Sequence, residues 1–206
     1  MTNPGGVTNS LKALPKAVLW DNRILCLLDQ RRLPGERSLI RCNKIEDVFE
    51  CIQQLAVRGA PAIGIAAAYG LLVGLFESDR SLTALREDLA ERAHYLIAAR
   101  PTAVNLPWAV TRMMAVISGE FGSSGELLDR LEQEAIAIHQ EDISACHQIG
   151  NHGVSLVRQR PNVLTHCNAG SLAVSELGTA LAPIYRAYEE GVEVHVLVDE
   201  TRPLLQ

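Results

Sequence analysis

Cys167 is the residue whose surroundings most directly suggest chemistry. It ends a short apolar run that predicts a strand over residues 162–167, and it precedes a predicted helix over residues 171–190. Ligands of open α/β sheets bind beyond the carboxyl ends of the strands, and the amides of a helix N-terminus lower a thiol pKa. Cys167 could therefore be a nucleophile, a proton donor or a polar wall beside a reacting carbon. From position alone, a buried and inert thiol is an equally good interpretation.

The segment Arg58-Gly59-Ala60-Pro61 is a candidate anion site. Pro61 suits the first turn of a helix, so the N–H groups of Gly59 and Ala60 would point outward at that terminus. Together with the Arg58 guanidinium they could hold a phosphate or a carboxylate. For an isolated four-residue motif, an ordinary loop with a solvent-facing arginine is the favoured interpretation. Arg100 ends a predicted helix, where interaction with the helix dipole explains a cation equally well.

A metal site is suggested only weakly, by side chains that recur one helical turn apart. These are His139, Asp142, Cys146 and His147. Their order matches no familiar ligand signature, and a solvated or interface face of a helix often carries such residues. We therefore predict no metal ion.

Composition narrows the class of protein. The 206 residues are 48% hydrophobic and 21% charged, and the net charge of −5 provides no basic footprint for nucleic acid or for an anionic membrane. The longest uncharged stretch, residues 60–76, contains Pro61 and three glycines and predicts a buried helix rather than a membrane span. The N-terminus lacks an apolar signal core, and the five cysteines are scattered. We expect a cytoplasmic protein with reduced thiols.

The order of predicted elements indicates an α/β protein in two parts. Residues 18–43 predict a small antiparallel meander, and helices follow to about residue 117. The glycine- and serine-rich segment 119–125 predicts a boundary, with domains of residues 1–122 and 123–206. After a helix from residue 126 to about 149, strands 162–167 and 192–198 flank the helix 171–190, which predicts a βαβ unit with parallel strands.

Two parallel strands make an incomplete sheet. Parallel sheets are normally covered on both faces and built from more strands. Either a partner chain completes this sheet or the polypeptide is an N-terminal piece of something longer, and we favour the second interpretation.

Four strings of the sequence carry a resemblance to a known family. They are residues 57–70 (VRGAPAIGIAAAYG), 99–106 (ARPTAVNL), 164–173 (LTHCNAGSLA) and 199–206 (DETRPLLQ). Together they resemble the methylthioribose-1-phosphate isomerases of the initiation factor 2B-like superfamily. The resemblance implies a small N-terminal domain with a short antiparallel sheet and helices, followed by a Rossmann-like parallel-sheet domain that is incomplete here. It also implies a homodimer without metal or nucleotide cofactor.

The activity implied by the resemblance is an aldose–ketose isomerisation in methionine salvage, from 5-methylthioribose 1-phosphate to 5-methylthioribulose 1-phosphate. Cys167 matches the family's active-site cysteine. The positions that match substrate-binding residues are Arg58, Gly59, Ala60, Arg100 and Gln206. The family's catalytic aspartate lies in a later Gly-Ala-Asp-Arg segment, which this sequence does not contain. We therefore expect the 206-residue chain to have no isomerase activity alone.

Two other interpretations remain open. The chain could be a regulatory or assembly module, akin to the initiation-factor subunits, that binds sugar phosphate without converting it. It could also be a defunct product that does not fold stably, because exposed sheet edges favour aggregation. Retention of Cys167 with its Asn-Ala-Gly flank favours the enzyme, because a binding module has no need of that thiol.

Overall fold

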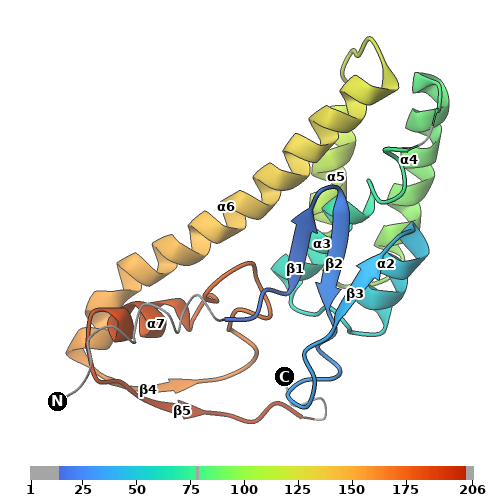
Figure 1. The fold of residues 1–206 in the computed structure, drawn as a ribbon. Helices are drawn as coiled ribbons and strands as arrows, with labels where there is room; N and C mark the ends of the chain where they lie inside the picture. Colours follow the sequence, from blue (N-terminus) through green and yellow to red (C-terminus); the bar gives the residue numbers. More distant parts are fainter. Residues whose placement is uncertain (1–13, 78, 203–206) are drawn as a thin grey trace. The chain divides into compact units, whose positions relative to one another are not determined.

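The computed structural model describes residues 14–77 and 79–202, whose helices and strands are labelled in Figure 1. These residues form two units, one of residues 17–141 and one of residues 142–202 with 14–16. The division falls within one long helix, α6 (Ser124–Gln159), whereas the expected domain boundary at 122/123 lies just before that helix begins. The first part of α6 belongs to the N-terminal unit because its apolar side chains, including Leu131 and Ile138, enter the core of that unit.

The expected antiparallel meander is confirmed. β1 (Val18–Asp21), β2 (Ile24–Leu28) and β3 (Leu39–Cys42) pair in the order β1-β2-β3. Leu25 and Leu27 alternate with more exposed neighbours along β2 and are fully buried. This alternation makes one face of the sheet apolar, and that face packs on the helices.

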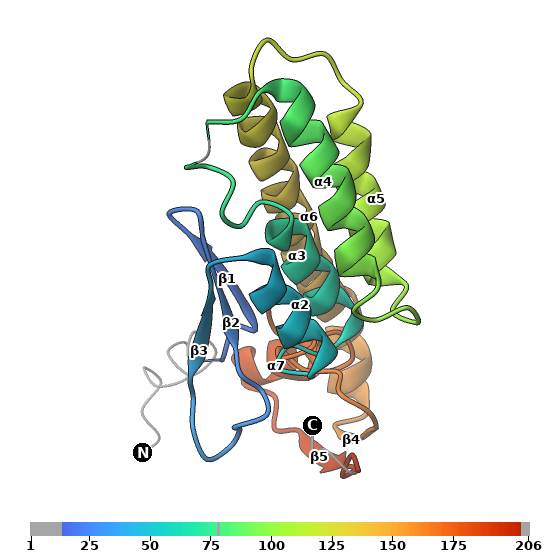
Figure 2. The same cartoon turned by 90° about the vertical axis from the view of Figure 1, so that its right-hand side faces the viewer.

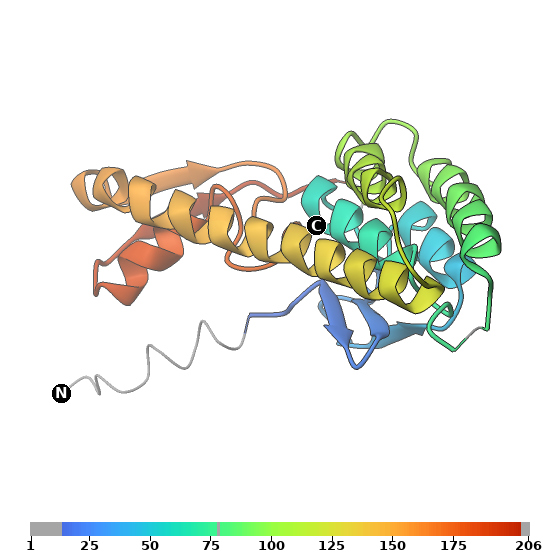
Figure 3. The ribbon, with the colours of Figure 1, turned by 90° about the horizontal axis from the view of Figure 1, so that it is seen from above.

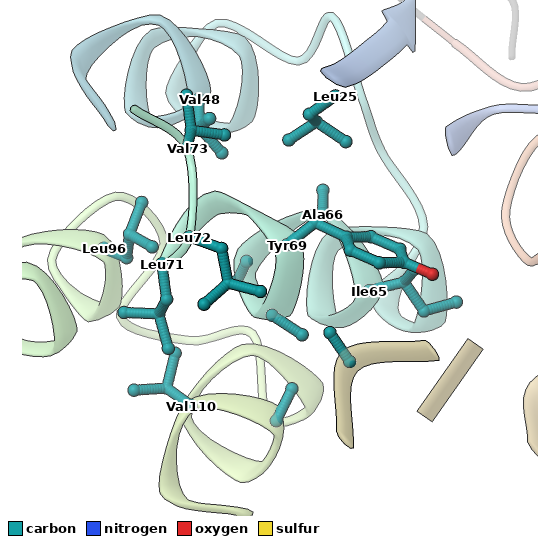
Figure 4. Packing of buried hydrophobic residues seen from close by; sticks show 14 of the residues in the cluster. Leu25, Val48, Ile65, Ala66, Tyr69, Leu71, Leu72, Val73, Leu96 and Val110 are labelled. Carbon is teal, nitrogen blue, oxygen red and sulfur yellow. The ribbon is translucent and has the colours of Figure 1, made fainter. Parts of the chain in front are cut away.

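Helices make up the rest of the N-terminal unit. They are α2 (Ile45–Gln53), α3 (Ala60–Gly70), α4 (Leu82–Ile97), α5 (Asn105–Ile117) and the first part of α6. Figure 2 shows the sheet on one side and α4 and α5 on the other, with α3 between them. Every residue of α3 from Ala62 to Gly70 is buried, as expected for residues 60–76, and Figure 4 shows side chains of α3 among Leu25, Leu96 and Val110.

None of the helices in the described ranges is long and apolar enough to cross a membrane. The apolar character of α3 instead serves the core of the N-terminal unit, as its burial shows.

Gly64 allows α3 and α5 to approach closely. A Cβ atom at this position would lie 2.9 Å from the backbone oxygen of Asn105, which cannot move as a flexible side chain could. We expect Gly64→Ala to lower the free energy of unfolding by about 1–3 kcal/mol through overpacking. Urea denaturation measures this effect. The control is Gly125→Ala in α6, where the nearest atom would be the Ser123 Oγ at 3.9 Å; equal losses in both variants would contradict the prediction.

The C-terminal unit contains the expected parallel pair. β4 (Asn162–Thr165) and β5 (His195–Val198) run parallel, with Leu164 opposite Leu197. These two leucines are 68% and 57% exposed. The α/β class is thus confirmed, and apolar side chains of this short sheet remain accessible to solvent.

The helix between these strands differs from the prediction. Residues 171–181 are not helical, and α7 (Ala182–Glu189) is much shorter than the expected helix over 171–190. Leu177 and Gly178 have φ values of 59° and 110°, in the left-handed region that a right-handed helix cannot contain. The preceding helix α6 also continues to Gln159, beyond the expected end near residue 149.

The second part of α6 packs closely on α7. A Cβ at Gly150 would lie 3.2 Å from the Ala182 backbone oxygen, and one at Gly153 would lie 2.5 Å from Pro183 Cγ. Figure 3 shows this part of α6 beside α7. The irregular segment 171–181, which connects β4 to α7, also contacts α6 through Ser175 and Asp142.

Candidate functional site

The N-terminus of α3 has the geometry expected of an anion site. Gly59 precedes the helix with φ 97°, a conformation that favours glycine, and its carbonyl accepts a hydrogen bond from the Ile63 N–H. Pro61 lies in the first turn, as predicted. The first amides of the helix therefore have no partners within the helix and are directed at its N-terminal end.

Arg58 is buried, so the interpretation as a solvent-facing loop arginine is wrong. The residue is 7% exposed, and its Nη2 donates a hydrogen bond of 2.7 Å to the backbone oxygen of Gln30. Its Nε is buried and has no hydrogen-bond partner among the described residues. A buried donor without an acceptor is costly, and an oxyanion at the adjoining helix terminus would provide one.

The charge of Arg58 is only partly balanced. Burial lowers the pKa of the Arg58 guanidinium, and the charge of Asp29 acts in the opposite direction. Asp29 itself is 4% exposed and is bound by Arg31, with 2.8 Å between Arg31 Nε and Asp29 Oδ1. Because Asp29 pairs with Arg31, the guanidinium of Arg58 keeps positive charge for a ligand.

The ion pair of Asp29 gives a pH prediction. Hydrogen bonding to Arg31 holds the pKa of Asp29 below its ordinary value. The ionised carboxylate therefore stabilises the fold above the unfolded-state pKa of about 4, and this contribution is lost as the pH falls through the lower folded-state pKa. We expect the stability difference between wild type and Asp29→Asn to be full at about pH 6 and to shrink below about pH 4. Urea midpoints across this range measure it; a constant difference would contradict the assignment.

Arg100 lies in the connection between α4 and α5 and is half-buried. Its backbone oxygen accepts a hydrogen bond from the Ala103 N–H, which shapes the turn before α5. The connection that carries Arg100 leads into α5, whose first residue, Asn105, lies beside Gly64 of α3. Both arginines belong to the N-terminal unit.

Cys167 is exposed and lies two residues beyond the end of β4 at Thr165, so the interpretation as a buried, inert thiol is wrong. Its φ of 69° lies in the left-handed region, which is unusual for a residue with a side chain. The expected helix N-terminus behind it is absent, because residues 171–181 are irregular. The position near the carboxyl end of a parallel strand is confirmed, but among the described residues no helix begins beside the thiol.

His166 and Asp199 form a pair that the sequence did not reveal. Their Nδ1 and Oδ2 atoms are 2.9 Å apart, at the adjoining ends of β4 and β5. The Asp199 N–H also donates to the backbone oxygen of Thr165, which extends the parallel pairing. The sequence did contain one signal for this pair, because both residues lie at the carboxyl ends of two strands that were predicted to run parallel.

The remaining site residues are distributed as follows. Arg58, Gly59 and Ala60 lie together at the start of α3, while Cys167 belongs to the C-terminal unit. Gln206 lies outside the described residues. Within the described ranges, no three His, Cys, Asp or Glu side chains gather in a way that could hold a metal ion.

Comparison with protein families and curated proteins identifies relatives. The model of the Initiation factor 2 subunit family matches residues 56–206. A methylthioribose-1-phosphate isomerase of Rhodopirellula baltica is 50% identical over 184 residues, covering 88% of this chain and 52% of the relative. One of Roseiflexus sp. is 46% identical, covering 93% and 56% respectively. The chain thus spans about half the length of the curated relatives that it matches.

Two solved structures are similar in fold. The 5-methylthioribose 1-phosphate isomerase of Pyrococcus horikoshii superposes with a TM-score of 0.88 at 34% identity, covering 100% of this chain and 58% of that one. The translation initiation factor eIF-2B subunit delta of A. fulgidus has a TM-score of 0.84 at 38% identity, covering 94% and 56% respectively. The fold is therefore shared by proteins with an enzyme's name and by one named for translation initiation.

Proposed function

Because the chain belongs to the initiation factor 2 subunit family, we propose that it carries part of the active site of an aldose–ketose isomerase. The substrate is 5-methylthioribose 1-phosphate and the product 5-methylthioribulose 1-phosphate, the reaction indicated by the names of relatives at 46–50% identity. The observation that carries the proposal is the buried Arg58 Nε, without an acceptor among the described residues, at the N-terminus of α3.

Arg58 binds the phosphate in this proposal. Its guanidinium is held by the Gln30 carbonyl, so its orientation is set before the ligand arrives. The first amides of α3, at Gly59 and Ala60, add hydrogen bonds to the same oxyanion. Arg100 provides a second cation for the sugar phosphate, and Gln206 contributes a further polar contact.

Cys167 acts at the reacting carbons. The isomerisation moves hydrogen from C2 to C1 of the sugar, breaks the ring bond between C1 and O4 and converts the C2 hydroxyl to a ketone. We propose that the Cys167 thiol donates its proton to O4 as that bond breaks, and that the proton lost from the C2 hydroxyl returns to the thiolate. The side chain also excludes water from one side of the site. The reaction leaves the overall oxidation state of the sugar unchanged, so it consumes no external oxidant or reductant.

The wider setting is also a proposal. We propose a homodimer that works in the cytoplasm on a small sugar phosphate and does not use nucleic acid. The net charge of −5 supports the last point, because binding to nucleic acid normally requires a basic surface.

A chimera tests the proposed function. The 206-residue chain is joined at Gln206 to the remaining C-terminal part of the Rhodopirellula baltica relative, which supplies the segment that this sequence lacks. We expect turnover of 5-methylthioribose 1-phosphate by the chimera and none by the 206-residue chain or by the C-terminal part alone. A folded chimera without turnover would contradict the proposal.

A second candidate function is a module that binds sugar phosphate without converting it. The likeness to the A. fulgidus protein, 38% identical and named as an initiation factor subunit, supports it. Turnover by the folded chimera distinguishes the two candidates. A binding module would bind 5-methylthioribose 1-phosphate in calorimetry, but the folded chimera would not convert it.

A further inference from the structure

The second part of α6 holds the segment that follows Cys167. Asp142 Oδ2 accepts a hydrogen bond of 2.8 Å from the backbone N–H of Ser175. One turn later, Cys146 is 1% exposed, and the backbone N–H groups of Glu176 and Gly178 interact with its sulfur. Two of the four residues that suggested a weak metal motif, Asp142 and Cys146, thus contact backbone groups of residues 175–178, whereas His139 pairs with Tyr69.

The side chain of Glu176 adds two contacts to this attachment. His147 Nε2 lies 3.3 Å from Glu176 Oε2, and Lys16 Nζ lies 2.8 Å from Glu176 Oε1. Both contacts are partly exposed and contribute little stability by themselves. The part-buried hydrogen bond from Ser175 to Asp142 is the stronger restraint, because a hydrogen bond to a charged group contributes more than one between neutral groups.

Residues 175–179 are joined in turn to the residues after Cys167. Gly178 forms a bridge with Gly170, and the Thr179 N–H donates to the Ala169 backbone oxygen at 3.0 Å. A Cβ at Gly178 would lie 2.3 Å from that same oxygen, so only glycine fits there. This close approach fixes the backbone immediately after Cys167 and Asn168.

The backbone of Cys167 needs such support. A non-glycine residue in a sparsely populated φ region is strained and persists only where its surroundings hold it. Cys167, with φ 69°, is exposed, so burial of its own side chain does not hold it there. The pairing of residues 169–170 with 178–179 is the restraint next to it in the chain.

We propose that Asp142 is a positioning residue for Cys167. Its carboxylate anchors Ser175, Ser175 and Gly178 lie on one short segment, and the bridge to Gly170 transmits the restraint to Cys167. The direction of the thiol is therefore set from α6. This inference rests on the proposed role of Cys167, but the contacts can be tested without any substrate.

Amide hydrogen exchange in the 206-residue chain tests the restraint. We expect Asp142→Ala to speed exchange of the Thr179 N–H by about 10–100-fold, the loss of one hydrogen bond to a charged group. The Asp199 N–H, which bonds to the Thr165 oxygen, reports on the β4–β5 pair and should be unchanged. Asp142→Asn keeps a side-chain oxygen acceptor and should stay near wild type, as should the control Gln148→Ala on the same helix.

Alkylation of Cys167 by iodoacetamide, quantified by peptide mass, measures the effect on the thiol. The rate constant should change several-fold in Asp142→Ala and be restored in Asp142→Asn. Unchanged Thr179 exchange and unchanged alkylation in Asp142→Ala would overturn the inference. Equal acceleration of exchange at the Asp199 N–H would also overturn it, because that would mean a general loss of structure. If Asp142→Ala does not fold, Asp142→Asn decides: the inference is overturned if this variant does not keep the wild-type rates of Thr179 exchange and Cys167 alkylation. None of these results depends on isomerase activity.

Discussion

Replacing Cys167 by alanine in the chimera is expected to lower kcat by about 10²–10⁴-fold, the usual contribution of a positioned proton donor. The KM should change little, because phosphate binding is assigned to Arg58 in the other unit. Steady-state kinetics with 5-methylthioribose 1-phosphate measures both constants. The expected result follows from an exposed thiol held in an unusual backbone conformation at the end of β4.

A matched control separates this effect from general thiol loss. Cys26→Ala removes a half-buried thiol on β2 and should leave kcat within about twofold of wild type, because a surface substitution away from the site has small effects. If Cys167→Ala retained wild-type kcat, Cys167 would not act in the reaction, and its assignment as the proton donor would be wrong.

Replacing Arg58 by alanine is the second large expected effect. The affinity for 5-methylthioribose 1-phosphate should fall by about 10–100-fold, because a charge-assisted hydrogen bond to phosphate is lost. Calorimetry with the 206-residue chain measures this directly. Arg58→Lys should recover only part of the affinity. In Arg58, Nη2 donates to the Gln30 carbonyl while Nε is left for the ligand, and the single ammonium group of lysine cannot take both positions.

The phosphate-free sugar and a distant arginine provide the controls for Arg58. Binding of 5-methylthioribose should be insensitive to Arg58→Ala, because the lost contact is to phosphate. Arg37→Ala, which removes an exposed arginine from the β2–β3 connection, should leave both affinities unchanged. Equal weakening for both ligands would mean that Arg58 supports the fold rather than the phosphate.

Local pattern was sufficient to predict most of the N-terminal unit. The meander and the helices α2 to α5 follow from alternation and helical periodicity, and in the structure the Ser81 Oγ caps α4 by accepting a hydrogen bond from the Ala84 N–H. Each of these signals lies within a few residues of the element that it predicts. The parallel pairing of β4 and β5 also followed, because a strand, a crossover and a strand permit few topologies.

The segment 171–181 could not be predicted in the same way. Its apolar residues Val174, Leu177 and Leu181 recur at helical spacing, and the local warnings were Gly178 and, within the predicted helix, Pro183. What prevents a helix is tertiary: Asp142 takes the Ser175 amide, and Gly178 approaches the backbone of Ala169. The helix-dipole argument for Cys167 failed for this reason.

The burial of Arg58 was likewise beyond the local pattern. Nothing in the four-residue motif indicates that the Gln30 carbonyl, from the segment after β2, accepts from its guanidinium. The local motif also does not indicate the nearby ion pair of Asp29 with Arg31, in which Arg31 balances the negative charge of Asp29. Long-range packing thus buries the Arg58 guanidinium, which the local motif did not predict.

The most direct test of the whole account is ¹³C NMR of 5-methylthioribose 1-phosphate incubated with the chimera. The account predicts that a ketone carbonyl signal at C2 of the sugar appears with time and that it is absent with either part alone. A chimera that folds, binds the sugar phosphate and leaves the C2 signal unchanged would contradict the proposed isomerase function.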